Sequence, residues 1–184
     1  MSAAFAAAIR DESPAGLIRD ALAGDEIAFA TIVERHRVAM TRVAYVVSGD
    51  ADVAEESVQA AWPIVWQRLG SVREPDRLGA WLASVAVNEA RQLVRHRRRR
   101  SIVEIAVATH ESATAPDPSA NVADIDLARA MAGLDPEDRA LLALRYVAGL
   151  NSTELGRALG MSASGLRRRL ARLLARLRME LGDA

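Results

Sequence analysis

The sequence predicts an all-α protein of two small helical domains joined by a flexible acidic linker. Apolar residues recur at helical spacing in both halves of the chain, whereas residues 101–126 hold five acids, two prolines and no base. The Ala-Pro-Asp-Pro stretch within that segment cannot continue a helix. An ordered loop within a single domain is the alternative, but roughly 25 residues is long for such a loop. We therefore predict a first domain at 1–100, a linker at 101–126 and a second domain at 127–184.

Capping and turn residues divide the first domain into helices. These signals are Ser13-Pro14, Gly24-Asp25, Ser48-Gly49-Asp50, Asp52 and the turn from Gly70 to Gly79. Pro63 interrupts the helix that begins near Asp52, and an interior proline costs roughly 3 kcal/mol, so we expect a bend or a boundary just before it. A last helix runs from about Ala80 into the basic run 95–100.

Three tryptophans occupy apolar positions of these helices, and we expect all three in the core. They are Trp62, Trp66 and Trp81. The alternative is that they stack on the bases of melted DNA. The basic run 95–100 is suited to a polyanion, with a disordered basic tail as the alternative.

The second domain begins near Asp126 and contains a predicted helix-turn-helix. Asp135 and Pro136 start a helix to Ala148, with Leu141, Leu144 and Val147 facing inward and Gly149 closing it. The next helix and the turn after it are marked by the capping box Asn151 and Glu154, by Gly160 and by the N-cap Ser162.

The last helix joins a leucine stripe to a set of arginines. Leucines at 166, 170, 173, 174 and 177 fall on one face, and at about 100° per residue Arg168 and Arg172 point away from it. Such arginines suit guanine edges or DNA phosphates. A solvated amphipathic helix is the alternative, but few acids follow Ser162 to pair with the arginines.

Composition excludes several classes of protein. The chain has 184 residues, no cysteine, and 24 basic residues balanced by 24 acids. No long apolar run or signal peptide is visible, so we expect a cytoplasmic protein without membrane insertion. The three histidines lack metal-ligand spacing, and no phosphate loop or nucleophile motif is present. We therefore expect no metal, no cofactor and no enzyme activity.

Both domains resemble the sigma-70 family of bacterial RNA polymerase specificity subunits, in particular its short extracytoplasmic-function (ECF) group. The second region of that family has patterns like G-D-x-x-A-F and W-L-x-x-I-A-x-N, matched here from Gly24 to Phe29 and from Trp81 to Asn88. The fourth region has a long pattern that Leu134 to Gly160 matches without a gap. After it the family has G-T-V-K-S-R-L, whereas residues 164–170 read SGLRRRL, so Arg168 replaces a small residue.

The resemblance implies a function and a set of binding residues. We expect a factor that binds core RNA polymerase, directs it to the −10 and −35 promoter elements and opens the DNA. The expected −35 residues are Ser164, Arg167, Arg168, Arg169, Arg172 and Arg176. The expected −10 residues are Arg73, Arg77, Asn88, Arg91, Arg95 and Arg98, with Asn88 and the loop 72–78 holding a flipped base. From the residues alone, Asn88 could equally cap or cross-link helices.

The same resemblance assigns the polymerase contact to the third helix. The expected residues are Asp52, Glu55, Glu56 and Gln59, and the family pattern is broken at Ser57, Ala60 and Pro63. An anti-sigma factor is a further expected partner, and we expect the free chain to be a monomer. The alternatives are an autonomous helix-turn-helix regulator that binds as a dimer, and an arginine-rich protein that binds nucleic acid without sequence preference.

Overall fold

The protein is helical throughout the described residues. The computed structural model describes residues 11–104 and 122–182, with side chains described for 11–100 and 126–182. Those ranges contain no strand. The elements are α1 (Pro14–Leu22), α2 (Glu26–Ser48), α3 (Ala51–Arg68), η1 (Leu69–Ser71), η2 (Pro75–Arg77), α4 (Leu78–Glu104), α5 (Val122–Ala132), α6 (Pro136–Leu142), η3 (Ala143–Val147), α7 (Ser152–Leu159) and α8 (Ala163–Gly182).

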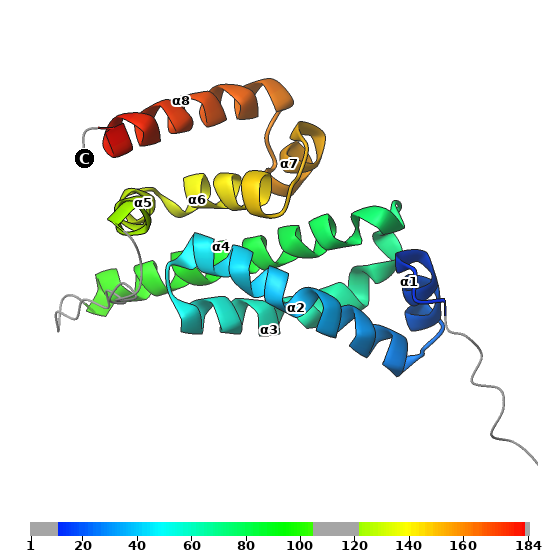
Figure 1. Ribbon diagram of the computed structural model, residues 1–184. Helices are drawn as coiled ribbons and strands as arrows, with labels where there is room; N and C mark the ends of the chain where they lie inside the picture. The colour runs from blue at the N-terminus through cyan, green and yellow to red at the C-terminus, as the bar shows by residue number, and fades with distance from the viewer. Residues whose placement is uncertain (1–10, 105–121, 183–184) are drawn as a thin grey trace, which may run out of the picture.

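The first domain is a bundle in which α2, α3 and α4 pack against one another and α1 packs against α2 at one end (Figure 1). Ile32, Met40, Val65 and Leu82 are almost completely buried between these helices. Ser13, Asp25 and Asp50 each accept a hydrogen bond from a backbone amide of the first turn that follows. The helix start at Ser13 was predicted, whereas Asp25 was predicted only as part of a break and Asp50 only as part of the end of the preceding helix. α3 therefore begins at Ala51, immediately before the predicted Asp52.

The second domain stacks α6, η3 and α8 over the bundle, with α7 at one end (Figure 1). Asp135 accepts a hydrogen bond from the Asp138 amide, and Pro136 is the first residue of α6, as predicted. The helix does not stay α-helical to Ala148, because residues 143–147 form a π-helical segment. Of the predicted inward stripe, Leu141 and Leu144 are buried, but Val147 is 43% exposed, which corrects that prediction.

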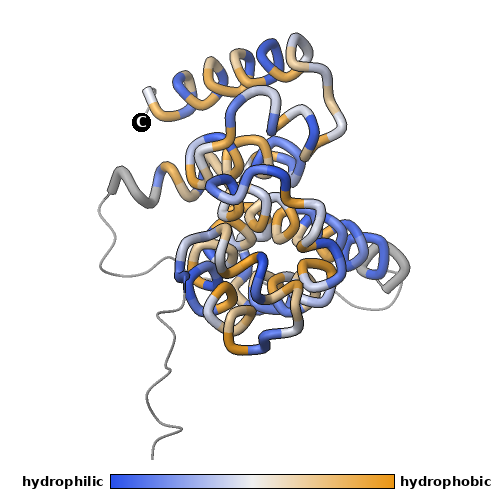
Figure 2. The backbone as a smooth tube through the Cα atoms, turned by 90° about the vertical axis from the view of Figure 1, so that its right-hand side faces the viewer, coloured by the Kyte–Doolittle hydropathy of each residue, from blue (hydrophilic) through white to orange (hydrophobic). Residues whose placement is uncertain are grey.

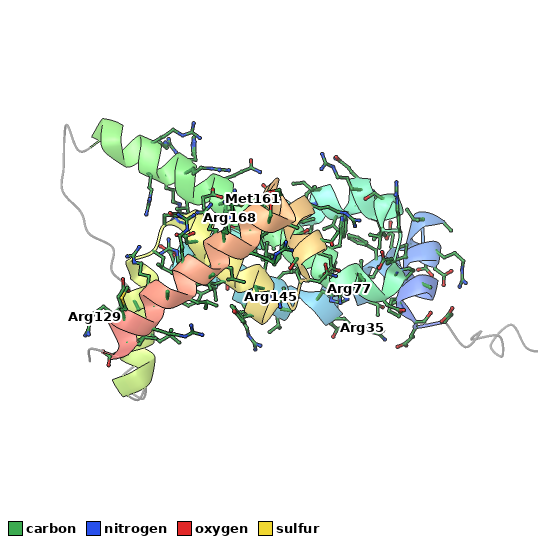
Figure 3. The ribbon with its side chains drawn as sticks, turned by 90° about the horizontal axis from the view of Figure 1, so that it is seen from above. Arg35, Arg77, Arg129, Arg145, Met161 and Arg168 are labelled. Atoms are coloured by element: carbon green, nitrogen blue, oxygen red, sulfur yellow. The ribbon has the colours of Figure 1, made fainter. Side chains whose placement is uncertain are left out.

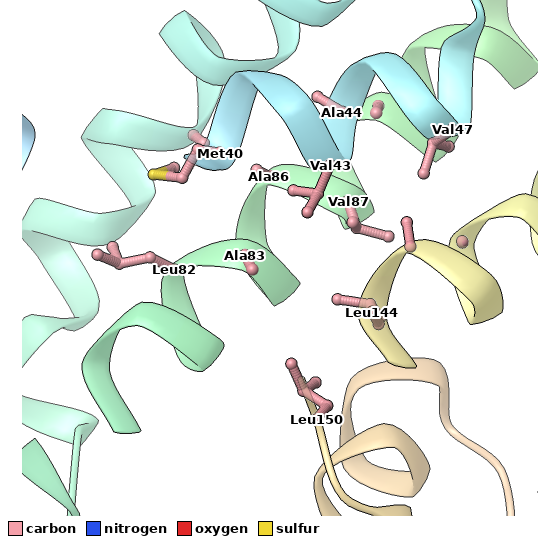
Figure 4. Packing of buried hydrophobic residues seen from close by; sticks show 14 of the residues in the cluster. Met40, Val43, Ala44, Val47, Leu82, Ala83, Ala86, Val87, Leu144 and Leu150 are labelled. Carbon is pink, nitrogen blue, oxygen red and sulfur yellow. The ribbon is translucent and has the colours of Figure 1, made fainter. Parts of the chain in front are cut away.

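The two domains share one continuous buried cluster. Leu144 and Leu150 point toward α4, where Ala83 and Val87 lie (Figure 4), and all four are buried within the same cluster. We call these four residues the seam. The backbone tube, coloured by the hydropathy of each residue, shows apolar residues where the two domains meet (Figure 2). The domains are thus joined by packing as well as by the chain between them.

Three further predictions are corrected or limited by the structure. α3 continues through Pro63 to Arg68, so there is no helix boundary at the proline. Trp66 is 47% exposed, with its ring edge-on to Phe29 at 4.8 Å, whereas Trp62 and Trp81 are partly buried against the core. α4 and α5 extend into the predicted linker to Glu104 and from Val122, and the rest of that segment lies outside the described residues.

Within the ranges 11–104 and 122–182, no helix has the length and apolarity needed to cross a membrane.

Candidate nucleic-acid interface

Because the leucine stripe of α8 packs against the rest of the protein, the arginines on the opposite face of the helix point toward solvent. Leu166, Leu173 and Leu177 are buried, and the Oγ of Ser162 accepts a hydrogen bond from the amide of Gly165 at 3.2 Å, which caps the helix as predicted. Arg168 is exposed on α8, which lies nearest the viewer when the structure is seen from above (Figure 3). Ser164, in the first turn, is also exposed. The predicted −35 surface is therefore an outward face of this helix.

The arginines of α8 fall into two groups. Arg169 donates to Asp138 at 2.6 Å and lies 3.5 Å from Asp135, so it ties α8 to the start of α6. Arg176 donates to Glu180 at 2.7 Å within α8 and to the carbonyl of Gly133. The others form no ion pair with any residue in the described part of the chain; they are Arg167, Arg168, Arg172 and Arg178. This second group is free to meet an external anion.

The turn that orients α8 is built by local caps. The Oδ1 of Asn151 accepts from the Glu154 amide at 3.1 Å, and Glu154 accepts from the Asn151 amide at 2.7 Å, which is the predicted capping box. Gly160 ends α7 at a φ of 67°, a left-handed conformation that glycine adopts without a steric penalty. Arg145 donates to the carbonyl of Leu150 at 2.9 Å and holds the loop that leads into α7. The helix-turn-helix is therefore present as predicted.

The predicted −10 residues gather on α4 and on the loop before it. Asn88 is partly buried and accepts at 3.1 Å from Arg91, one turn along α4, so the amide oxygen is held within its own helix. Arg77 lies in η2 and is partly exposed, and Arg73 is exposed in the preceding loop. Arg98 lies further along α4 in the exposed basic run. These side chains therefore extend from the loop before α4 into its C-terminal half without forming one cluster.

Two glutamates of the second domain bind arginines of this set. Both carboxylate oxygens of Glu154 accept from Arg77, at 2.6 and 2.5 Å. The hydrogen bonds between Arg77 and Glu154 hold the pKa of Glu154 below its ordinary value. They also raise the pKa of Arg77 above its ordinary value. Glu137, in the first turn of α6, accepts from Arg91 and, at 3.1 Å, from Arg95. We call Glu137 and Glu154 the bridging acids.

A cavity lies between the loop before α4 and the N-terminus of α7. Its volume is about 880 Å³, and Arg73, Arg77 and Asn88 line one side of it. Asn151 and Glu154 of α7 line the other side. The predicted base-holding residues therefore face a space of molecular size that the second domain partly covers.

Arg139 is a buried arginine that the analysis of the sequence did not single out as a functional residue. It is 8% exposed, and a Cβ built on Gly49 would lie 4.0 Å from its Nη1, so the guanidinium lies beside the C-terminus of α2. Carbonyl groups at a helix C-terminus carry partial negative charge, which suits a cation. Burial, and next the nearby charge of Arg98, lower the pKa of Arg139. The Nε of Arg139 and that of Arg91 are buried without a hydrogen-bond partner in the described structure.

The predicted polymerase-binding residues share one exposed face of α3. Asp52, Glu55, Glu56 and Gln59 are all exposed, and Glu56 accepts from Arg97 of α4 at 2.8 Å. Ser57 is 1% exposed and donates to the carbonyl of Val53 at 2.5 Å. Of the three departures from the family pattern, Ser57 therefore faces the core, whereas Ala60 and Pro63 are exposed.

Sequence reasoning found the arginines but missed the acids that bind them. Glu154 was recognised only as part of a capping box, which does not indicate a partner in the other domain. The pairs Arg77–Glu154 and Arg91–Glu137 join residues that are 77 and 46 positions apart. Only the packing of the domains brings them together.

Two parts of the chain match descriptions of the sigma-70 family. Residues 32–100 match Sigma-70 region 2, and residues 130–179 match Sigma-70, region 4. The first match covers most of α2, all of α3 and most of α4, and the second covers the helix-turn-helix.

Named relatives agree with these matches. The chain is 30% identical over 171 residues to the probable RNA polymerase sigma factor RfaY of Xanthomonas campestris pv. campestris, covering 88% of this chain but only 42% of that protein. It is 28% identical over 173 residues to the RNA polymerase sigma factor CnrH of Cupriavidus metallidurans, covering 88% and 90% of the two chains. It is 28% identical over 171 residues to the ECF RNA polymerase sigma factor SigL of Mycobacterium tuberculosis, covering 90% and 96%.

Two solved structures have the same fold. The structure of CnrH in complex with the cytosolic domain of CnrY superposes with a TM-score of 0.65 at 26% identity and covers 94% of this chain and 99% of that one. The sigma factor RpoE from Bartonella quintana, in complex with the anti-sigma factor NepR, gives a TM-score of 0.69 at 23% identity, covering 84% and 96%.

The helical fold with its helix-turn-helix is that of a two-domain transcription factor. The chain belongs to the sigma-70 family and, within it, to the ECF group.

Proposed function

We propose that this protein binds core RNA polymerase, directs it to promoters with −35 and −10 elements and opens the DNA. The polymerase performs the phosphodiester chemistry, and this protein performs none. The observation that carries the proposal is the outward face of α8, where four arginines without ion pairs in the described structure project from a helix-turn-helix.

The −35 element is assigned to the N-terminal half of α8. Arg168 and Arg172 lie opposite the leucine stripe and are exposed, and a guanidinium can donate to both N7 and O6 of guanine. Arg167 is exposed beside them, and Ser164 is exposed in the first turn. Arg169 and Arg176 are held by Asp138 and Glu180, which supports a role for these two in positioning α8.

The −10 element is assigned to α4 and the loop before it. Asn88 can present a donor and an acceptor to the Watson-Crick edge of an extruded base. The open cavity of about 880 Å³ beside Asn88 supports this role, because it has room for an extruded base. Arg73, Arg77 and the arginines along α4 would then meet the phosphates of the same strand.

The polymerase contact is assigned to the exposed face of α3. This face carries Asp52, Glu55, Glu56 and Gln59 and lies on the outside of the first domain. Because Ser57 is buried, its departure from the family pattern changes the core and not this surface. RpoE and CnrH were each solved in complex with a protein partner, and we propose an anti-sigma partner for this chain as well.

Run-off transcription with purified bacterial core RNA polymerase tests the proposal. The templates are a library of promoter fragments from a GC-rich genome, and reactions are run with and without this chain. We expect initiation that depends on the protein, at sites that share −35 and −10 elements. No initiation at any site, together with no complex between the chain and core polymerase on a sizing column, would refute it.

Three variants assign the surfaces in the same assay. Arg168→Ala should reduce initiation at −35-dependent sites, and Asn88→Ala should reduce opening, measured by permanganate reactivity of unpaired thymines. Arg129→Ala is the matched control, because Arg129 is an exposed arginine of α5 that pairs only with Asp126 of the same helix in the described structure. Equal losses in all three variants would contradict the assignment.

A further inference from the structure

A second cavity runs between α3 and α4 within the first domain. The two helices pack side by side (Figure 1), and the cavity between them has a volume of about 1360 Å³. We call it the α3–α4 groove. Most of the residues that line it have no role in the proposed function. Its volume is more than sufficient for a small-molecule ligand.

The floor of the α3–α4 groove is made by small and apolar side chains. Ser57 is 1% exposed, and Ala60 and Ile64 line the same wall, one turn of α3 apart. Val85 and Leu93 line the facing wall from α4. Ser57 and Ala60 are also two of the positions at which the family pattern is broken, and their small side chains leave space above the floor. A flat ring fits against such a surface.

One end of the groove is basic. Arg95 and Arg99 line it, one turn apart on α4, and Arg99 pairs with no acid in the described part of the chain. Arg95 uses one donor on Glu137 and is 49% exposed, so its other donors remain available. Glu56 also lines this end, but it accepts from Arg97 at 2.8 Å, which offsets its charge. Because guanidinium groups bind phosphate through paired hydrogen bonds, this end suits phosphate groups.

The middle of the groove carries a carboxylate with an unused acceptor. Glu89 is partly buried and accepts one hydrogen bond, from Gln92 at 3.0 Å. Its Oε2 forms no hydrogen bond to any residue that the structure describes. Burial raises the pKa of this carboxyl above its ordinary value, since the charged form has lost water. A ligand with two adjacent N–H donors would satisfy both oxygens of the carboxylate.

We propose that the α3–α4 groove binds a guanine nucleotide. The base lies over Ala60 and Ile64 with its edge on Glu89, and the phosphates bind Arg95 and Arg99. The Watson-Crick edge of guanine carries two adjacent donors, whereas adenine presents an acceptor between its donor and the rest of the ring. From Glu89 to Arg99 the distance along α4 is about 15 Å, which an extended nucleoside triphosphate and the arginine side chains can span together. Binding at this groove needs neither polymerase nor promoter DNA.

Fluorescence anisotropy with the full-length chain tests this binding. The probes are the N-methylanthraniloyl (mant) derivatives of GTP and ATP, which carry the same fluorophore on the ribose. We expect saturable binding of mant-GTP and at least about tenfold weaker binding of mant-ATP, because adenine leaves the buried acceptor of Glu89 unpaired. Unlabelled GTP should displace mant-GTP. Pyrophosphate should compete at least about tenfold less well, since it lacks the base.

Two pairs of variants locate the site. Ala60→Phe fills the groove from an exposed position of α3 and should weaken mant-GTP binding by about tenfold. Its control is Ala39→Phe, at an exposed alanine of α2 outside the groove. Arg99→Gln should cause a similar loss, whereas Arg42→Gln, with the same change of net charge on the exposed side of α2, should cause less than about a twofold loss. Circular dichroism verifies the helix content of each variant.

A third substitution tests recognition of the base. Glu89→Gln keeps the size of the side chain and an acceptor for Gln92, but it replaces one acceptor with a donor. We expect mant-GTP binding to fall by about tenfold while mant-ATP binding does not fall, so that the preference for guanine is lost. A purely structural role of Glu89 would weaken the binding of both probes equally.

Several results would overturn the proposal. They are no saturable binding of mant-GTP up to about 1 mM, equal affinity for the two mant nucleotides, and equal losses in the test and control variants. Displacement by pyrophosphate as effective as that by GTP would overturn it too, because the binding would then be one of phosphate charge alone. Failure of run-off transcription together with guanine-specific binding that Glu89→Gln abolishes refutes only the proposed function.

Discussion

The two arginine-rich surfaces of this protein differ in what holds them. On α8, Arg168 and Arg172 are exposed and form no ion pair within the described residues. On α4 and in η2, Arg91, Arg95 and Arg77 are bound by acids of the other domain. The difference shows that arginine content alone does not say whether a surface is available, because the positions of a few acids decide it.

The comparison also separates two kinds of acid. Asp138 and Glu180 bind Arg169 and Arg176 inside the second domain, so they position α8 in any arrangement of the two domains. Glu137 and Glu154 bind arginines across the seam, and these ion pairs exist only while the domains are packed. The same kind of ion pair therefore positions a helix within one domain in the first case and stabilises the packing of two domains in the second.

The largest effect should come from the seam, which packs the second domain against α4. Leu144→Ala should lower the free energy of unfolding by about 2–5 kcal/mol, because Leu144 is fully buried and its truncation leaves a cavity. Urea denaturation followed by circular dichroism measures the loss. Leu22→Ala is the control, since Leu22 is 55% exposed and should cost less than about 0.5 kcal/mol. A loss at Leu144 as small as that at Leu22 would mean that the seam is absent in solution.

The next effect concerns the surface that is already exposed. Arg168→Ala should weaken binding of the holoenzyme to a −35 duplex by about 1–3 kcal/mol and leave the free energy of unfolding unchanged, because the side chain makes no ion pair in the described structure. Fluorescence anisotropy across a salt series measures both the loss and the salt slope. Arg129→Ala should alter neither. An unchanged affinity in Arg168→Ala would show that this face of α8 is not the DNA-reading face.

A smaller effect is expected at the turn that orients α8. A Cβ at Gly156 would lie 2.8 Å from the carbonyl oxygen of Met161, which is closer than Cβ atoms come to other atoms in proteins. Gly156→Ala should therefore shift the turn and cost about 1 kcal/mol, although alanine favours a helix in general. Gly182→Ala is the control, because a Cβ there meets nothing within 4 Å. Thermal denaturation compares the two, and a gain of stability at Gly156 would contradict the expected clash.

The smallest effect separates two glutamates by the direction of their pKa shifts. The hydrogen bond from Arg77 lowers the pKa of Glu154, and burial raises that of Glu89, both from an ordinary value of 4.5. Glu154 therefore adds stability that is present above pH 4.5 and is lost as the pH falls through its lowered value. Carboxyl NMR titration should find the two groups on opposite sides of 4.5. An unshifted Glu154 would mean that Arg77 is not bound to it.

Local features were predictable from the sequence because their causes are local. The caps at Ser13, Asp25, Asp135 and Ser162 and the capping box at Asn151 each depend on residues within four positions, and all of them form. The leucine stripe of α8 followed from its period in the same way. The outward arginines of that helix followed from the stripe.

Features that depend on tertiary packing were not predictable in this way. Trp66 has the hydrophobicity of a core residue, yet α3 has more apolar positions than its buried face accommodates, and the ring lies exposed beside Phe29. Pro63 removes one amide from α3, but the helix continues through it because neighbouring turns and packing hold the backbone. The seam joins segments more than 50 positions apart, and no periodicity indicates which apolar faces will meet.

One carboxylate serves both the helix-turn-helix and the contact between domains. The Oε2 of Glu154 accepts from the Asn151 amide at 2.7 Å and from Arg77 at 2.5 Å. A substitution that leaves no side-chain acceptor at position 154, such as Glu154→Ala, removes both the hydrogen bond from Arg77 and the cap of α7. Selection for a well-folded α7 therefore also preserves the carboxylate that accepts from Arg77. We expect mutations that abolish the contact between the domains to occur at Arg77 or Glu137 more often than at Glu154.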